Sequence, residues 1–414
     1  MNPPRLAGVP ALDDPQAARR AGRDLLSLAL IDTRNHLLHA LAQFEAPATL
    51  RWAAQAAWYQ EHWIVRHVQC QRGEACDATA PRLGGRDAQQ EAWQQGQGRA
   101  PSGADLRGWL AQSLDATCEL LHTAADSDAG LHFYRLALAH EDRCGEAMNE
   151  EAALHPHPHP HSHPHPHPHQ IQHPQMRPRE RADAPGPAAR VQTVPLWLPA
   201  QRWRLGSEPA SGLVPAGERW AHDVQVPEFE IDAQAVCWAQ WAEFVVDGGY
   251  DRPELWSLPG WAWVQTQGRR APRGVEQMAG GALVQRGGVL QRAAAGQAAG
   301  GISRFEAEAW CTWAGRRLPT EPEWELAASS AESRGFLWGD VLEWVAGSPR
   351  AWPGHRPVPG DIDPLPQALP GVASHGVLRG AGPHTRRRAR HAKSRRFVPL
   401  THDAAGCGFR SCAI

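Results

Sequence analysis

Histidines are concentrated in one stretch of this 414-residue chain, where their spacing suits metal binding. Nine of the 22 histidines lie between His155 and His173, and most of them alternate with proline. Imidazole nitrogens ligate Ni, Cu and Zn, so the tract is a candidate for metal storage or delivery. The alternative is an incidental low-complexity insertion, because proline at every second position prevents a helix. We expect an extended, exposed segment, and we expect deletion of residues 155–169 to leave folding nearly unchanged.

A run of basic residues near the C-terminus is a second candidate for binding chemistry. Residues 386–396 contain seven lysines and arginines, a composition typical of segments that contact phosphate groups. No aromatic residue is interleaved with them before Phe397, and the whole chain has a net charge of −2. We therefore predict that nucleic acid is not a partner.

Glutamates and cysteines of the C-terminal half are candidates for catalysis, but a structural role is favoured. The three glutamates within Glu321–Glu325 follow Arg316 and Arg317. Their position indicates ion pairs and hydrogen bonds to buried backbone rather than acid–base chemistry. Cys311 and Cys412 are expected to be small buried residues rather than nucleophiles.

The first part of the chain is expected to position its residues on helices. Apolar residues recur at helical spacing over residues 15–46, 50–69, 104–125 and 131–154, which predicts four helices. An antiparallel bundle is the simplest way to bury four such stripes. Residues 71–102 are rich in Gly, Gln and Arg, which predicts a long, poorly packed connection.

The chain beyond the histidine tract has short predicted strands, frequent Gly and Pro, and many of the 19 tryptophans. Helical patches are expected at Trp238–Asp247 and Arg304–Gly315, within an α+β domain that has much irregular structure. Tryptophan richness indicates large amphipathic contacts or flat sites that stack on ligands. The predicted fold class is α + (α+β), with a helical domain at 15–154, a His/Pro-rich linker at 155–192, a second domain at 193–414, and a cleft between the two domains.

Composition excludes several classes of protein. Lys and Arg total 42 against 44 Asp and Glu, which gives no general attraction to anionic membranes or nucleic acid. No run of about 18 apolar residues is present, so we predict no membrane-spanning helix. Eight cysteines at irregular spacing do not form a disulfide framework, and the N-terminus has no apolar signal segment. A cytoplasmic location is therefore expected.

The C-terminal sequence resembles the formylglycine-generating-enzyme, or sulfatase-modifying-factor, family over about residues 193–414. The resemblance is strongest in Phe305–Glu325, which ends in Arg-Leu-Pro-Thr-Glu-Pro-Glu-Trp-Glu. Shorter matching stretches are 226–245, 339–344, 377–380 and 408–410. The resemblance implies an irregular, C-type-lectin-like domain. It also places the basic run near the substrate cleft, where some arginines are expected to pair with glutamates of the domain. Copper binding in formylglycine-generating enzymes needs a late cysteine pair, and residues 379–397 contain no cysteine, so that activity is not expected.

A helical bundle ahead of such a domain resembles the EgtB-type sulfoxide synthases of ergothioneine biosynthesis, whose bundle is of the DinB type. Trp58–Trp63 and His140–Glu146 carry this resemblance. Asp32–Asn35 and His391–Phe397 make the chain most similar to the SenA branch, the selenoneine synthases. The resemblance implies an iron(II)- and O2-dependent enzyme that forms a C–S or C–Se bond on hercynine, with a thiol or a selenosugar as donor.

The same resemblance implies where a metal would bind. The three histidine ligands of the family correspond to Gln55, His140 and Cys144, which are expected to converge in the bundle, with Glu146 nearby to hold them in place. His140 and Cys144 are one helical turn apart on the same face. Thiolate and amide oxygen are both possible ligands, so we expect weakened iron binding, Zn or Cu in place of iron, or loss of the metal. His62 is either a substitute ligand or a surface histidine.

The resemblance also implies substrate contacts, which we assign to Arg143, Trp58, Phe397 and Asp403. An aromatic wall suits the trimethylammonium group of hercynine by cation–π attraction. None of the three tyrosines occupies a position that predicts catalysis, so the catalytic residue stays unassigned. The alternative function is a degenerate, non-catalytic paralogue that binds a small ligand or a metal. The choice between sulfur and selenium and the oligomeric state are left open.

Overall fold

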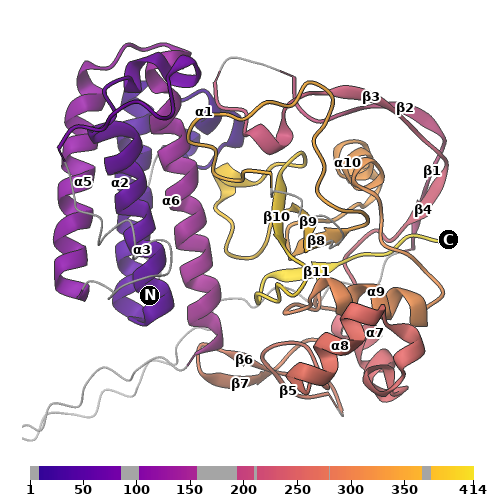
Figure 1. The fold of residues 1–414 in the computed structure, drawn as a ribbon. Coiled ribbons are helices and arrows are strands. Elements are labelled where there is room, and N and C mark those ends of the chain that lie inside the picture. Colours follow the sequence, from indigo (N-terminus) through magenta and orange to yellow (C-terminus); the bar gives the residue numbers. More distant parts are fainter. Residues whose placement is uncertain (1–8, 85–101, 156–193, 209–211, 279, 366–373) are drawn as a thin grey trace, which may run out of the picture.

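The computed structural model describes residues 9–84, 102–155, 194–208, 212–278, 280–365 and 374–414 (Figure 1). The histidine tract after His155 lies outside these residues. The helices before it are α1 Pro15–Arg19, α2 Arg23–Gln43, α3 Pro47–Gln60, α5 Gly103–Thr123 and α6 Asp128–Leu154, with short helical turns at Pro10–Leu12 and Cys70–Ala75 and a π-helical turn at Glu61–Val65.

All four predicted helices are present, and the first two differ most from the structure in their boundaries. The expected helix over 15–46 is two helices, because Gly22 takes an extended conformation at the N-cap of α2. The expected helix over 50–69 begins earlier, at Pro47, where the fixed φ of proline suits the first helical position. Its last turn, Glu61–Val65, is a π-helix.

The four long helices form a bundle in which α6 packs against α2 and α3, and α5 packs on their other side (Figure 1). Thr33 contacts Asp142 and Phe44 stacks on His155, so α2 and α6 run in the same direction. The predicted all-antiparallel arrangement is therefore wrong. The long connection between α3 and α5 explains the difference, because it allows the chain to return to the other end of the bundle before α5 begins.

The C-terminal part contains eleven short strands in the described residues: β1 Leu196–Leu198, β2 Gln201–Leu205, β3 His222–Val226, β4 Phe229–Ile231, β5 Val275–Gln277, β6 Leu283–Arg286, β7 Val289–Arg292, β8 Leu342–Val345, β9 His375–Gly380, β10 Arg395–Pro399 and β11 Cys407–Phe409. The main sheet has the order β10-β9-β8-β11, in which β11 pairs with β8 in parallel and the other pairs are antiparallel. Three smaller sheets pair β1 with β4, β2 with β3, and β5, β6 and β7 in sequence.

Four helices accompany these strands: α7 Trp238–Val246, α8 Leu258–Gln267, α9 Arg304–Trp313 and α10 Glu321–Ser330. The patches predicted for α7 and α9 are confirmed as helices, and Gly315 follows α9 with a positive φ of 63°. The sequence analysis missed α8 and α10. Both begin with a capping residue and a proline, Ser257-Leu-Pro and Thr320-Glu-Pro, which is a recognisable start signal.

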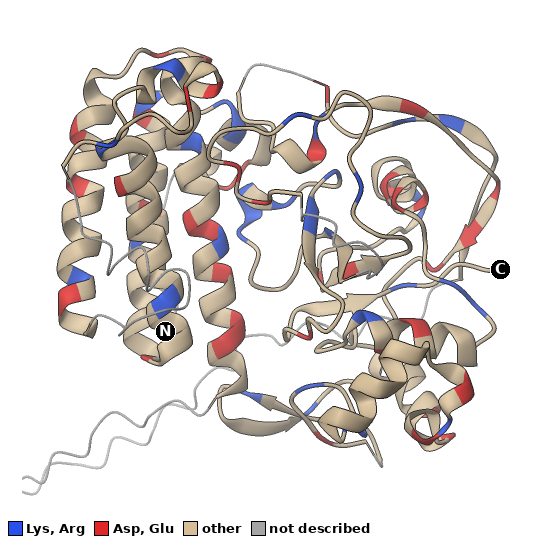
Figure 2. Ribbon diagram, viewed as in Figure 1, with Lys and Arg blue, Asp and Glu red and all other residues tan. Residues whose placement is uncertain are grey.

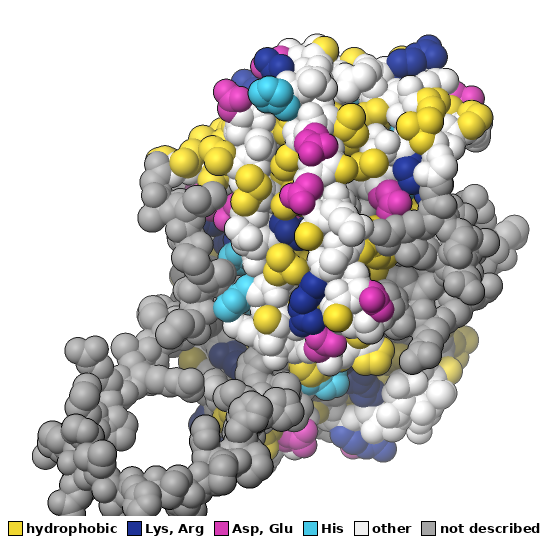
Figure 3. Space-filling view, turned by 90° about the vertical axis from the view of Figure 1, so that its left-hand side faces the viewer, with side chains coloured by type: hydrophobic (Ala, Val, Ile, Leu, Met, Phe, Trp, Pro, Cys, Tyr) yellow, Lys and Arg dark blue, Asp and Glu magenta, His cyan; other side chains and the backbone are white. Residues whose placement is uncertain are grey.

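Buried tryptophans form much of the C-terminal core. Trp241, Trp324 and Trp344 are fully buried, so part of the tryptophan richness reflects packing rather than ligand stacking. Charges of both signs are interspersed over the helices and the C-terminal part (Figure 2). The outer face of the bundle also mixes apolar, acidic and basic side chains (Figure 3). Of the helices in the described ranges, none combines the length and apolar character that crossing a bilayer requires.

Candidate functional site

His140 and Cys144 lie together on α6, at the seam where α6 packs against α3. Their side chains are in contact, with the His140 Nδ1 3.7 Å from the Cys144 Sγ. The ring of Tyr59, from α3, stacks on the His140 ring with 4.3 Å between centroids and 19° between planes. The Tyr59 hydroxyl donates to the Gly360 carbonyl oxygen, which ties a loop of the C-terminal part to this seam.

Burial keeps both groups uncharged. It lowers the pKa of His140 to about 3, and the nearby Arg143 acts in the same direction. Burial raises the pKa of the Cys144 thiol, as does the carboxylate of Glu141. The pair at neutral pH is therefore a neutral imidazole beside a protonated thiol.

Gln55 lies on the same face of α3 as Tyr59, one turn earlier. Because α3 and α6 run in opposite directions, the stack of Tyr59 on His140 brings Gln55 level with Cys144. Convergence of the three side chains on one point stays a prediction. In the parts of the chain that the structure describes, no group of three or more His, Cys, Asp and Glu side chains is arranged to hold a metal ion.

The donor set does not fit the three-imidazole iron site that the resemblance implies. One imidazole is present, at His140, with an amide at Gln55 and a thiol at Cys144. The His62 ring stacks on Trp58 with 4.6 Å between centroids, and its Nε2 lies 3.2 Å from Arg82. Its role as a substitute ligand stays a prediction.

The opposite side of α6 faces the C-terminal part through buried ion pairs. Glu146 accepts hydrogen bonds from the Thr385 hydroxyl and from Arg396, at 2.8 Å for the latter. Burial opposes the charge of Glu146, but Arg396 and Arg143 outweigh it and lower its pKa. Glu146 lies about 200° around the helix from Cys144, so its carboxylate supports this interface and is turned away from the thiol.

Glu150 lies one turn beyond Glu146 on α6. Its buried carboxyl group has fewer hydrogen-bond partners than it could accept. Its Oε1 is buried without a hydrogen-bond partner. Burial, followed by the charge of Glu146, raises the pKa of Glu150 to about 8. Glu150 is not among the site residues predicted from the sequence, although its spacing of four residues places it on the same face of α6 as Glu146.

Each of the four predicted substrate contacts has partners within the protein. Arg143 forms two hydrogen bonds with Asp363, at 3.0 and 2.6 Å, and Asp403 is paired with Arg269. Trp58 stacks on His62 inside the bundle. Phe397, on β10, lies against the guanidinium of its neighbour Arg395, with 4.8 Å to the ring centroid. The substrate assignments remain proposals.

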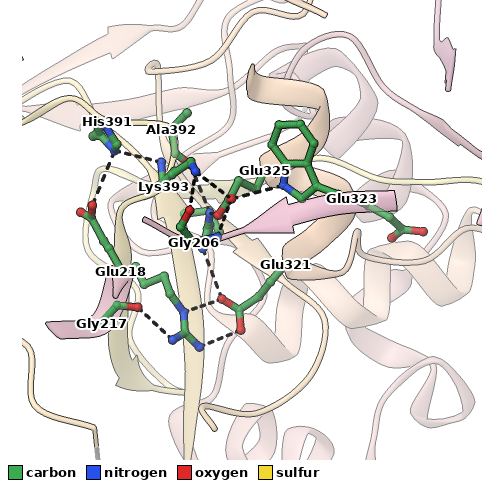
Figure 4. Close-up of polar contacts among 12 residues, drawn as sticks. Gly206, Gly217, Glu218, Glu321, Glu323, Glu325, His391, Ala392 and Lys393 are labelled. Atoms are coloured by element: carbon green, nitrogen blue, oxygen red, sulfur yellow. Dashed lines mark hydrogen bonds and ion pairs between the residues drawn. The ribbon is translucent and has the colours of Figure 1, made fainter. Parts of the chain in front are cut away.

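The glutamates of α10 are structural, as their sequence context predicts. Glu323 caps α10 and pairs with Arg317, whereas Glu321 pairs with Arg395 and Glu325 with Arg379. Figure 4 shows Glu321 and Glu325 turned into one polar cluster, with Glu323 pointing away from it. Arg316 pairs with Glu230 and Asp232 instead of these glutamates.

The basic run is largely neutralised within the protein, which agrees with the expected pairing to glutamates. Arg395 and Arg396 bind Glu321 and Glu146. Arg386 and Arg388 both bind Asp32, and Arg388 also binds Asp142. These contacts join the run to α2, α6 and α10.

Comparison with known proteins defines the family. Residues 187–410, more than half of the chain, match the sulfatase-modifying factor enzyme 1-like domain, and the protein therefore belongs to this family. The predicted combination of a helical N-terminal region and such a domain is confirmed, whereas the DinB type of the bundle stays a prediction. The structure of PvdO from Pseudomonas aeruginosa aligns over 53% of this chain and 93% of its own, at 17% identity and a TM-score of 0.31, a likeness too distant to inform the site.

Several named relatives are hercynine oxygenases. The hercynine oxygenase of Mycolicibacterium smegmatis is 31% identical over 278 residues, which cover 62% of this chain and 56% of that protein. That of Mycobacterium tuberculosis is 32% identical over 183 residues, covering 34% of this chain and 43% of that protein. The formylglycine-generating enzyme of Streptomyces coelicolor is 31% identical over 185 residues, 38% of this chain and 55% of its own. The chain thus spans about half the length of these relatives.

Proposed function

We propose that this protein binds hercynine and belongs functionally with the EgtB-type hercynine-modifying enzymes. The observation that carries the proposal is the buried seam of His140 and Tyr59, which borders a C-terminal domain whose relatives include proteins named hercynine oxygenases. The proposed activity is O2-dependent formation of a C–S or C–Se bond on hercynine, with a thiol or a selenosugar as the donor.

The proposed ligand contacts follow the chemistry of hercynine. Its trimethylammonium group is attracted to aromatic faces, for which we assign Trp58 and Phe397. Its carboxylate can form paired hydrogen bonds with an arginine, and we assign Arg143 to this contact. We assign Asp403 to a further polar contact with the ligand. Arg143 would have to exchange its bonds to Asp363 for bonds to the ligand.

A second candidate function is a non-catalytic paralogue that retains ligand binding. It is supported by residue type, since Gln55 and Cys144 stand at two of the three positions where the family resemblance implies histidine. The cofactor is a proposal in both cases: iron(II) by family resemblance, Zn or Cu through Cys144, or none.

Calorimetric titration of the purified chain with hercynine, followed by incubation with Fe(II), O2 and a thiol or selenosugar donor, tests both candidates. Binding together with a new C–S or C–Se product, detected by mass spectrometry, supports the enzyme. Binding without product supports the paralogue. Histidine, which lacks the three N-methyl groups of hercynine, is the matched control ligand. Absence of preferential hercynine binding contradicts the enzyme and also a paralogue that retains hercynine binding.

A further inference from the structure

A cleft with a volume of about 790 Å³ lies in the C-terminal part, between α9, the first turn of α10 and the end of β3. Its described lining residues lie outside α3, α6 and the basic run. Figure 1 shows α9 and α10 on the side of the C-terminal part that faces away from the bundle. Pockets for small molecules typically have volumes of about 300–1,000 Å³, so this cleft has room for an organic ligand.

Apolar side chains from several segments line the cleft. They are Val226, Pro227, Leu255, Leu318, Pro322 and Ala346. A ligand that covers such a surface removes apolar area of both molecules from water, which is favourable. The cleft therefore suits a ligand with an apolar body.

Three of the four arginines that line the cleft are neutralised by acids of the protein. The pairs are Arg304 with Glu308 at 2.8 Å, Arg317 with Glu323 at 2.8 Å, and Arg316 with both Glu230 and Asp232 at 3.2 Å. These ion pairs hold the walls of the cleft together and leave no excess charge of either sign.

Arg350, the fourth arginine, is different. It is exposed on the loop that follows β8, and within the described part of the chain it forms no ion pair. A guanidinium binds a carboxylate through two parallel hydrogen bonds. One unpaired guanidinium beside apolar side chains favours a ligand that combines an apolar body with a single negative charge.

We propose that this cleft binds a small organic acid, with its apolar body against Leu255 and Leu318 and its carboxylate on Arg350. Binding is non-covalent and needs no metal. The proposal does not rest on hercynine as a ligand, because none of the residues assigned to hercynine lines the cleft.

Calorimetric titration of the full chain with naphthylacetate tests the proposal. Naphthylacetamide is the matched probe, since it has the same apolar body without the charge. We expect the amide to bind at least about tenfold more weakly than the acid, because hydrogen bonds to charged groups are stronger than those between neutral groups.

The variant Arg350→Gln removes the charge without breaking an ion pair of the described chain. We expect it to weaken binding of the acid at least about tenfold and to leave binding of the amide unchanged. Arg51→Gln, which removes an exposed arginine on α3, is the control and should change neither affinity.

The variant Thr312→Trp tests the location, because Thr312 is exposed on α9 and lines the cleft. An indole at this position occupies part of the volume, so we expect weaker binding of both probes, with circular dichroism verifying the fold. Unchanged binding in Thr312→Trp places the probes elsewhere and overturns the proposal. The proposal is equally wrong if the acid does not bind, if acid and amide bind equally, or if Arg350→Gln leaves the affinity for the acid unchanged.

Discussion

The family resemblance implies three imidazole ligands at the α3–α6 seam, where this chain has Gln55, His140 and Cys144. Replacing Gln55 and Cys144 together by histidine adds two neutral nitrogen donors beside His140, which suit Fe(II) better than an amide and a thiol do. We expect the double variant, after loading with Fe(II) and desalting, to retain iron at about one equivalent. Metal analysis of protein purified without a nickel column gives the ratio of iron to protein.

The single variants Gln55→His and Cys144→His serve as controls for the double variant and are expected to retain less iron. Stoichiometric iron in the unmodified chain would show that Cys144 is a working iron ligand. Little iron in the double variant, equal to that in the unmodified chain, would show that the three positions do not converge.

The charge of Glu150 links the stability of the fold to pH. Burial and Glu146 raise its pKa from 4.5 to about 8, and the opposing charges of Arg396, Arg143 and Arg273 do not cancel this. The folded state therefore binds a proton that the unfolded state has released between these pH values. Stability from this group is present below about pH 4.5 and falls as the pH rises toward 8.

The variant Glu150→Gln removes this dependence, because an amide of nearly the same shape has no proton to lose. We expect its melting temperature to rise relative to that of the unmodified chain as the pH increases from 5 to about 8. Glu119→Gln, an exposed change on α5, is the control and should show no such trend. A constant difference across this range for Glu150→Gln would contradict a raised pKa.

Some contacts of the candidate site can be predicted from the sequence. The spacing of four residues predicts that His140 and Cys144 share a helix face, and the structure brings them into contact. The partner Tyr59 is not predictable in this way, because its stack on His140 depends on the register between two helices. The free oxygen of Glu150 likewise depends on how the C-terminal part covers α6.

At the scale of elements, Tyr59 joins α3, α6 and the loop at Gly360. Tyr59→Phe keeps the ring against His140 but removes the hydrogen bond to the Gly360 carbonyl oxygen. We expect it to lower the free energy of unfolding by about 1–2 kcal/mol. Tyr59→Ala also removes the buried ring, and we expect a loss of about 3–5 kcal/mol. Urea unfolding followed by circular dichroism measures both, and equal losses would mean that the ring contributes nothing.

The elements themselves differ in how far local sequence determines them. Long apolar stripes predict all four bundle helices, but helix direction depends on the connection between α3 and α5, which carries no periodic signal. In the C-terminal part, α10 begins in a run of three glutamates that lacks an obvious apolar stripe. Its helix is stabilised by the Thr320–Glu323 capping box and by ion pairs to distant arginines.

At the scale of the whole molecule, the basic run acts as a connector between the helices and the C-terminal part. Its arginines meet acids on α2 and α6 that lie far away in the sequence. No local sequence pattern identifies these acids. The sequence therefore predicts that the arginines form ion pairs, but not which acid each one binds. The same contacts neutralise several of the seven basic residues within the protein.

Arg388 is the most deeply buried member of this connection, with a side chain 2% exposed. It holds Asp142 at 2.7 and 2.8 Å and Asp32 at 2.8 Å. Arg388→Ala leaves buried carboxylates without their main partner, so we expect it to lower the free energy of unfolding by about 3–5 kcal/mol. Arg107→Ala breaks an ion pair with Glu45 in which both side chains are more than 40% exposed, and should cost less than about 1 kcal/mol. Comparable losses in the two variants, measured by urea unfolding, would show that the connection contributes no more to stability than a surface ion pair.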